Sequence, residues 1–231
     1  MKGWRAAAAV LLAVACLWQW TRGAERTAHI PPQTPRCDLA PALDEGSPAG
    51  GSERARQLFL QTGLGPAGVS AVLGEGGAPA LLRMQAQLYA PALWQCRSGT
   101  PLTRQETLDE AVQMAPLEDG DILVTTASHF FGWRQGHACL VVDAAHGETL
   151  DCGMSVAEIG SAPSWAYRAN FVVLRLAGAS RQERAAVAAA ARRTLLGAPY
   201  NIAVGIFPAK GDGTGVTSTH CAHLVWSAYR A

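Results

Sequence analysis

Near its end the chain carries a cysteine placed as a thiol nucleophile would be. Cys221 lies in "STHCAHLVWSAYRA", where a loop rich in Gly and Thr meets an apolar segment with helical spacing. A thiol at a helix N-terminus faces unpaired backbone N–H groups and the positive end of the dipole, which lower its pKa. The same N–H groups can bind an oxyanion. Cys221 is therefore the candidate nucleophile, and the alternative is an inert buried cysteine.

A thiol nucleophile needs a base, and the short segment after Cys221 offers little choice. Among six histidines, His137 is best placed, because it follows a glycine and opens the apolar segment "HACLVVD". That pattern is typical of a strand, whose first side chain can project from the rim of a sheet. The alternative for His137 is a strand-edge histidine bonded to backbone. His220 and His223 flank the thiol in sequence and are weaker candidates.

A general base is usually oriented by a third polar group. The segments "HACLVVD" and "GETLDCG" are joined by a short turn containing Gly147, which predicts a hairpin. In that hairpin residues 150–152 lie roughly opposite 139–141, so Asp151 reaches His137 from the neighbouring strand. The sequence predicts a cluster of Cys221, His137 and Asp151.

Short apolar segments and one long helix must position this cluster. A capping box, Ser180 with Glu183, begins a helix rich in Ala that stops at Gly197. The pattern indicates an α+β domain over residues 116–231, with a small antiparallel sheet packed on helices. The four predicted strands are "GDILVTT", "HACLVVD", "GETLDCG" and "NFVVLRL".

The region before residue 116 shows no cluster of reactive side chains. Residues 52–115 have helical patterns and predict a structural cap, and 23–51 are rich in Pro and Gly and predict a linker. In residues 1–22 a basic start precedes an apolar run, which predicts an export signal or a short membrane anchor. A third alternative is a lipoprotein modified at Cys16. We therefore expect an exported protein of the cell envelope, anchored or secreted.

Charge and cysteine content narrow the function classes. The formal net charge is +1, from 19 basic and 18 acidic residues without long runs, so no surface for nucleic acid is indicated. Six cysteines in an exported chain permit disulfides, and Cys37 with Cys96 is one open pairing.

The order of the motifs resembles a known family. "GDIL", "GHACLVVD" and "TLDC", followed by "LLGAPYN" and "HCAHLVWSAY", resemble the papain-like domain of NlpC-type cell-wall peptidases with its two halves exchanged. The chain is thus similar to the circularly permuted branch, such as the YiiX-like permuted papain-like amidases, and more distantly to lecithin:retinol acyltransferase-type proteins. The resemblance covers roughly residues 118–231. Relatives often have Glu or His where this chain has Asp151.

This resemblance implies a permuted papain-like fold with Cys221 as nucleophile, His137 as base and Asp151 as the orienting residue. Tyr200 corresponds to the tyrosine of the family's "PY" motif near the active site. Trp133 lies just before His137 and is a candidate for the apolar wall of the groove, with ordinary packing as the alternative. The expected activity is that of a thiol hydrolase, an amidase or peptidase, without a metal or cofactor.

The substrate remains open at this level. A thioester at Cys221 is compatible with cleavage of a peptide-like amide, hydrolysis of a lipid-linked amide or ester, or acyl transfer. Association with a membrane would come through the N-terminus. A non-catalytic envelope protein that binds a ligand in the same groove is the alternative from another class.

A zinc site is the chemical rival of the triad. The candidate ligands on the predicted hairpin are His137, Cys139, His146 and Cys152. Because neighbours in a strand alternate faces, Cys152 should point away from the face that carries Asp151. This argument disfavours both the zinc site and a disulfide between Cys139 and Cys152.

Overall fold

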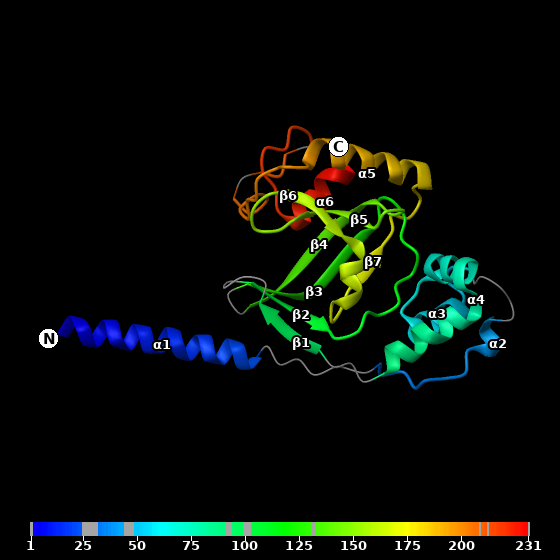
Figure 1. Cartoon of the computed structure of the whole chain (residues 1–231), viewed down its shortest axis with the longest axis horizontal. Helices are drawn as coiled ribbons and strands as arrows, with labels where there is room; N and C mark the ends of the chain where they lie inside the picture. Colours follow the sequence, from blue (N-terminus) through cyan, green and yellow to red (C-terminus); the bar gives the residue numbers. More distant parts are fainter. Residues whose placement is uncertain are drawn as a thin grey trace.

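A computed structural model describes most of the chain, and an antiparallel sheet is its centre (Figure 1). Helices α5 (Arg181–Leu195) and α6 (Cys221–Arg230) pack against one face of the sheet. A helical group, which includes α3 (Glu53–Thr62) and α4 (Pro66–Tyr89), lies apart from these two helices (Figure 1). The described residues are 2–24, 32–43, 49–90, 94–98, 103–130, 133–207, 209–211 and 213–230.

Within the described residues the sheet has seven strands, of which six follow one another in the order of the chain. The last strand, β7, pairs with the first part of β3 instead. The α+β class with a small antiparallel sheet, predicted from the sequence, is confirmed. The strands are β1 (Trp94–Ser98), β2 (Thr103–Leu108), β3 (Ile122–Phe130), β4 (Trp133–Asp143), β5 (Glu148–Cys152), β6 (Ala157–Ser161) and β7 (Val172–Leu174).

All four predicted strands are present, and the helix with the capping box is α5. The prediction of helices throughout 52–115 is wrong for its last part, because β1 and β2 form a hairpin there that pairs with β3. The segment "TRQETL" of β2 is almost wholly polar. It therefore lacks the apolar alternation by which a strand is recognised in a sequence.

The helical section also begins earlier than predicted. Ser52 caps α3 by accepting a hydrogen bond from the backbone N–H of Ala55, as its position indicated. However, Leu39 and Ala42, from the predicted linker, are buried in the core of this section. Ala42 belongs to the short helix α2 (Ala40–Leu43). The predicted linker over 23–51 is thus wrong for residues 32–43.

The two faces of the sheet bury different residues. On one face Leu140 and Leu150 pack against α5 and α6. On the other face Cys139 and Val141 pack against Trp165, which belongs to the 3₁₀ helix Ala162–Tyr167. Because strand residues alternate faces, His137 and Cys139 of β4 share the face of Trp165, whereas Leu140 faces α5 and α6.

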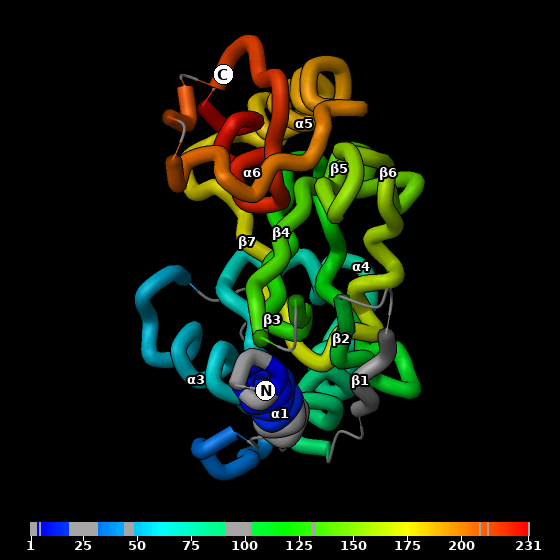
Figure 2. The backbone as a smooth tube through the Cα atoms, turned by 90° about the vertical axis from the view of Figure 1, so that its left-hand side faces the viewer, coloured from blue at the N-terminus to red at the C-terminus, as the bar shows by residue number. Residues whose placement is uncertain are grey.

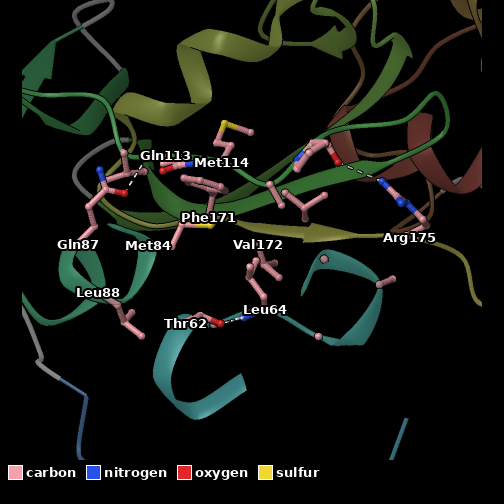
Figure 3. Close-up of a pocket in the computed structure, with 18 of the residues that line it drawn as sticks. Thr62, Leu64, Met84, Gln87, Leu88, Gln113, Met114, Phe171, Val172 and Arg175 are labelled. Carbon is pink, nitrogen blue, oxygen red and sulfur yellow. Dashed lines mark hydrogen bonds between the residues drawn. The ribbon is translucent and has the colours of Figure 1, made fainter. Parts of the chain in front are cut away.

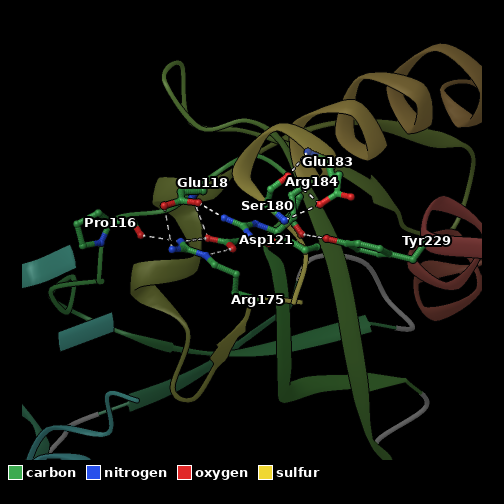
Figure 4. A network of polar contacts seen from close by, with 10 residues as sticks. Pro116, Glu118, Asp121, Arg175, Ser180, Glu183, Arg184 and Tyr229 are labelled. Carbon is green, nitrogen blue, oxygen red and sulfur yellow. Dashed lines mark hydrogen bonds and ion pairs between the residues drawn. The ribbon is translucent and has the colours of Figure 1, made fainter. Parts of the chain in front are cut away.

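A partly buried ion network joins the start of β3 to α5 and to β7 (Figure 4). Arg175 donates to both carboxylate oxygens of Asp121 at 2.7 Å and also contacts Glu118. Arg184 of α5 contacts Glu118 as well, and the Tyr229 hydroxyl of α6 donates to a backbone carbonyl nearby. The network fixes α5 and α6 against the sheet.

The first helix, α1 (Lys2–Ala24), extends away from the sheet (Figure 1). Its described apolar side chains are exposed, among them Leu11 and Leu12. No helix in the described part of the chain is both long enough and apolar enough to cross a membrane.

Candidate active site

Cys221 begins α6, so its backbone stands in the first turn of a helix. The first helical hydrogen bond runs from the N–H of Leu224 to the carbonyl of His220, at 2.8 Å. Leu224 and Ala228 are buried against the sheet and hold the helix there. The predicted placement of a thiol at a helix N-terminus is therefore present in the structure.

His137 and Asp151 meet across two neighbouring strands. The Nε2 atom of His137 lies 2.9 Å from Oδ2 of Asp151 and 2.8 Å from Oδ1. The Cα partner of Asp151 on β4 is Cys139, the register expected from the hairpin. Strand alternation places His137 and Cys139 on one face, which brings Asp151 within reach of the ring. Both polar side chains are half-buried.

Electrostatics link this pair to the thiol. Burial opposes the imidazolium, but hydrogen bonds to Asp151 and Cys221 outweigh it and raise the pKa of His137 to about 9. Burial likewise works against the thiolate. The hydrogen bond with His137, helped by the backbone N–H groups of Ala138 and Ala222, nevertheless lowers the pKa of Cys221 below its ordinary value. The two shifts favour a thiolate beside an imidazolium.

The geometry also assigns the two ring nitrogens of His137. Because Nε2 faces Asp151, the nitrogen left for the Cys221 thiol is Nδ1. Asp151 then fixes the tautomer and orientation of the ring. The arrangement can take a proton from the thiol on one side of the ring while the carboxylate stabilises the charge on the other.

Two residues beside His137 were not identified from the sequence. The indole of Trp165 stacks on the imidazole, with ring centroids 6.0 Å apart and planes 15° apart. The guanidinium of Arg168 lies 3.9 Å from the centroid of the Trp165 ring. Both come from "SAPSWAYR", a 3₁₀ turn without a regular apolar period, so only the tryptophan itself, in a segment rich in small residues, could have drawn attention to them.

The thiols of Cys139 and Cys152, on β4 and β5, lack this activation. Burial raises the pKa of Cys139 far above its ordinary value, and burial raises that of Cys152 to about 11. The thiol of Cys152 donates to the carbonyl of Thr219 at 3.6 Å. Cys37 is free, and the side chain of Cys96, the partner considered above, lies outside the part of the chain that the structure describes. Cys139 and Cys152 are free as well and belong to opposite cores.

The two predicted groove residues differ in position. Tyr200 bridges Thr219 in the backbone and packs against the core under α6, and burial together with the charge of Cys221 raises its pKa. Trp133 stands at the turn end of the β3–β4 hairpin with 59% of its surface exposed. At about 3.3 Å per strand residue it is roughly 13 Å along β4 from His137. The structure brings Tyr200 to the site and leaves Trp133 outside it.

The donors considered for zinc do not gather. His146 is exposed at the hairpin turn, where its Nδ1 atom lies 2.8 Å from a carboxylate oxygen of Asp143. No three potential ligands among His, Cys, Asp and Glu lie close enough to share a metal ion within the described residues.

A cavity of about 520 Å³ lies elsewhere, between the helical section and the sheet (Figure 3). Leu64, between α3 and α4, and Met84 of α4 line it from the helical section. Met114 and Phe171 line it from the side of the sheet. Arg175, at one end, is already paired with Asp121. Cys221, His137 and Asp151 are not among the lining residues, so the cavity is separate from the thiol.

No family model, no curated protein and no solved structure matches the chain.

Proposed function

We propose that the protein is a cysteine-dependent hydrolase of the amidase or peptidase type. One observation carries the proposal: His137 stands between Asp151 and the Cys221 thiol, with its pKa raised while that of the thiol is lowered. Opposite shifts in a thiol and a neighbouring histidine are the arrangement that activates a cysteine nucleophile.

In the proposed reaction the Cys221 thiolate attacks the carbonyl carbon of an amide or ester. The tetrahedral oxyanion receives hydrogen bonds from backbone N–H groups at the start of α6, including that of Cys221. His137 then donates its proton to the leaving amine or alcohol, and a thioester remains on Cys221. Water, deprotonated by His137, hydrolyses the thioester and restores the thiol. Asp151 keeps the ring oriented throughout, and no step requires a metal or cofactor.

The same features support a papain-like domain in permuted order. The strand that bears the base, the strand that bears the orienting carboxylate and the helix that bears the thiol follow one another as β4, β5 and α6. We propose membership of the circularly permuted, YiiX-like branch on this order. Amides of the cell envelope, peptide-like or lipid-linked, are the proposed substrates. Export or anchoring through the N-terminus is part of the same proposal.

Acyl transfer to a lipid would pass through the same thioester, so it is distinguished by the acceptor alone. A non-catalytic binding protein is disfavoured by the activated thiol, because a groove that only binds has no need of a lowered thiol pKa.

A labelling experiment on the folded protein tests the proposal. Iodoacetamide at neutral pH, followed by peptide mapping, should modify Cys221 far faster than Cys139 or Cys152. Cys221→Ala should lose the rapid label, and His137→Ala should slow it and move its pH profile. Incubation with p-nitrophenyl acetate should give an acetylated Cys221 that is detectable by mass spectrometry. An equal labelling rate in His137→Ala and wild type would refute the proposed dyad.

A further inference from the structure

Two histidines that flank Cys221 hold one loop against α6. We call residues 201–207 and 209–211 the tethered loop; it belongs to the segment between α5 and α6 (Figure 2). The Nε2 atom of His220 lies 3.1 Å from the carbonyl oxygen of Val204. The Nε2 atom of His223 lies 3.2 Å from the carbonyl oxygen of Lys210. Both contacts join the loop to the first turn of the nucleophile helix.

The tautomers of these histidines follow from their partners. A carbonyl oxygen can only accept, so Nε2 carries the hydrogen in both rings. The backbone N–H of His223 donates to Nδ1 of His220 at 3.4 Å, so His220 is neutral and also caps α6. Burial lowers the pKa of His220 and favours this neutral form. Each histidine is therefore committed to structure and is not available as the base.

The base of the loop is closed by further hydrogen bonds. The backbone N–H of Asn201 donates to the carbonyl of Thr219 at 2.7 Å, and its side-chain amide donates to Ser218 at 3.2 Å. Within the loop the N–H groups of Ile206 and Phe207 both donate to the carbonyl of Ala203. The loop is thus a compact turn with a defined position relative to the residues that flank Cys221.

This compact turn presents apolar side chains to solvent. The exposed fractions are 49% for Ile202, 66% for Ile206 and 88% for Phe207, whereas Val204 is buried. Neighbouring large apolar side chains exposed on a surface commonly mark a binding site. Here they belong to a loop whose backbone is hydrogen-bonded to the histidines on either side of Cys221. The occupant that this position favours is the part of a substrate next to its reacting carbonyl.

We infer that the tethered loop forms an apolar subsite beside Cys221 that binds an aliphatic chain of the substrate, with His220 and His223 as positioning residues. This inference rests on the proposed function and adds a substrate class to it. The aliphatic chain belongs either to a lipid or to an apolar side chain of a peptide. Ile206 and Phe207, the most exposed of the three, make the main contacts.

Chloroacetamides that differ only in their N-alkyl group test the subsite. The Cys221 thiolate displaces chloride from the CH₂Cl carbon, so a C–S bond forms, a C–Cl bond breaks and the reacting group is constant. In the wild type the second-order rate constant should rise at least tenfold from N-methyl to N-octyl. A gain that stops near four carbons indicates a peptide side chain, and a gain that continues to eight indicates a long lipid chain.

The double variant Ile206→Ser with Phe207→Ser should reduce the octyl-to-methyl ratio to below about twofold. The matched control is Leu174→Ser on β7, where Leu174 is 48% exposed, outside the loop, and the ratio should stay at the wild-type value. A flat ratio in the wild type, or a ratio that survives in the double variant, would overturn the subsite.

The positioning role is tested by two replacements of one histidine. His220→Gln keeps a donor near the place of Nε2, and His220→Asn keeps an acceptor near the place of Nδ1. We expect the asparagine variant, which retains the helix cap but loses the contact with Val204, to lose at least fivefold in the octyl-to-methyl ratio. The glutamine variant should retain the ratio. Equal ratios in the two variants would remove the positioning role.

The same data separate this inference from the proposed function. The rate with the N-methyl probe and its dependence on His137 report on the dyad. The octyl-to-methyl ratio reports on the loop. If the N-methyl rate ignored His137→Ala, the proposed function would fail; if the rate depended on His137 but the ratio were flat, the subsite alone would fail.

Discussion

Each strand of the β3–β4 hairpin carries a histidine that pairs with a carboxylate on a neighbouring strand, and the two pairs look alike but differ in their surroundings. Nε2 of His137 lies 2.8 Å from Asp151, and Nε2 of His129 lies 2.8 Å from Glu106. The side chains of the first pair are 17% and 21% exposed, and those of the second are 1% and 3% exposed. The distances therefore do not distinguish the pairs, whereas access and neighbours do.

The neighbours decide what each pair can do. Glu106 is also contacted by the guanidinium of Arg134, so this carboxylate is part of an ion cluster that joins β2, β3 and β4. His137 instead has a thiol as its second partner, at the start of a helix. A histidine–carboxylate pair thus becomes chemically useful where the ring also meets a nucleophile that a substrate can reach. The buried pair serves the fold.

The largest effect is expected on turnover when His137 is removed. His137→Ala should reduce the hydrolysis of p-nitrophenyl acetate about 10³-fold, because a positioned general base contributes roughly 10²–10⁴-fold. The matched variant His129→Ala, compared at equal folded concentration, should retain the wild-type rate within about threefold. Steady-state kinetics with circular dichroism as a check on folding provide the measurement. Similar losses in both variants would erase the distinction between the pairs.

For stability, we expect the His129–Glu106 pair to matter more than the His137–Asp151 pair. Glu106→Gln removes one charge from a cluster buried in the sheet and leaves Arg134 without that anion, which should cost about 3 kcal/mol in the free energy of unfolding. The reactivity of Cys221 in the folded variant should remain unchanged. Urea denaturation and thiol labelling give the two readouts. A stable Glu106→Gln protein with a slow thiol would mean that the buried pair belongs to the site.

A smaller effect is expected from Asp151→Asn, in the form of a changed pH profile. His137 is protonated below its pKa of about 9, so the alkaline limb of the wild-type rate should fall as pH rises through this value. Without the Asp151 carboxylate that pKa falls, and the limb should move to lower pH. Turnover at pH 8 should drop roughly tenfold, since a lost orienting hydrogen bond to a charged group is worth about 1.5–3 kcal/mol. An alkaline limb that keeps its position would contradict the link between the two residues.

The sequence predicted the reactive cluster because local rules fix its parts. A short turn sets the hairpin register, strand alternation sets the shared face of His137 and Asp151, and the helix start sets Cys221. The two pairs of the hairpin could not be separated in this way. The partner of His129, Glu106, is on β2, a strand without an apolar pattern. Neither this strand nor the burial of the pair could therefore be predicted from the sequence.

The helical section and the surroundings of His137 show the same limit of prediction from local sequence patterns. The packing of Leu39 from the predicted linker depends on contacts distant in sequence, which no local period reports. For a similar reason the sequence pointed to Trp133 as a site residue and did not point to Trp165. Nearness in sequence favoured Trp133, whereas the fold brings Trp165 to His137 from a turn beyond β6.

The smallest expected effect concerns Trp165, which we regard as a positioning residue. Trp165→Phe keeps an aromatic ring beside His137 but reduces the stacked area, so the thiol alkylation rate at neutral pH should fall only about threefold. Trp165→Leu should fall further and should broaden the pH profile, because the imidazole loses a parallel partner that limits its rotation away from Asp151. A purely structural role would lower the unfolding free energy in both variants without changing the pH profile. Rate against pH for the wild type and the two variants, at temperatures where all remain folded, therefore decides between orientation of the base and simple packing.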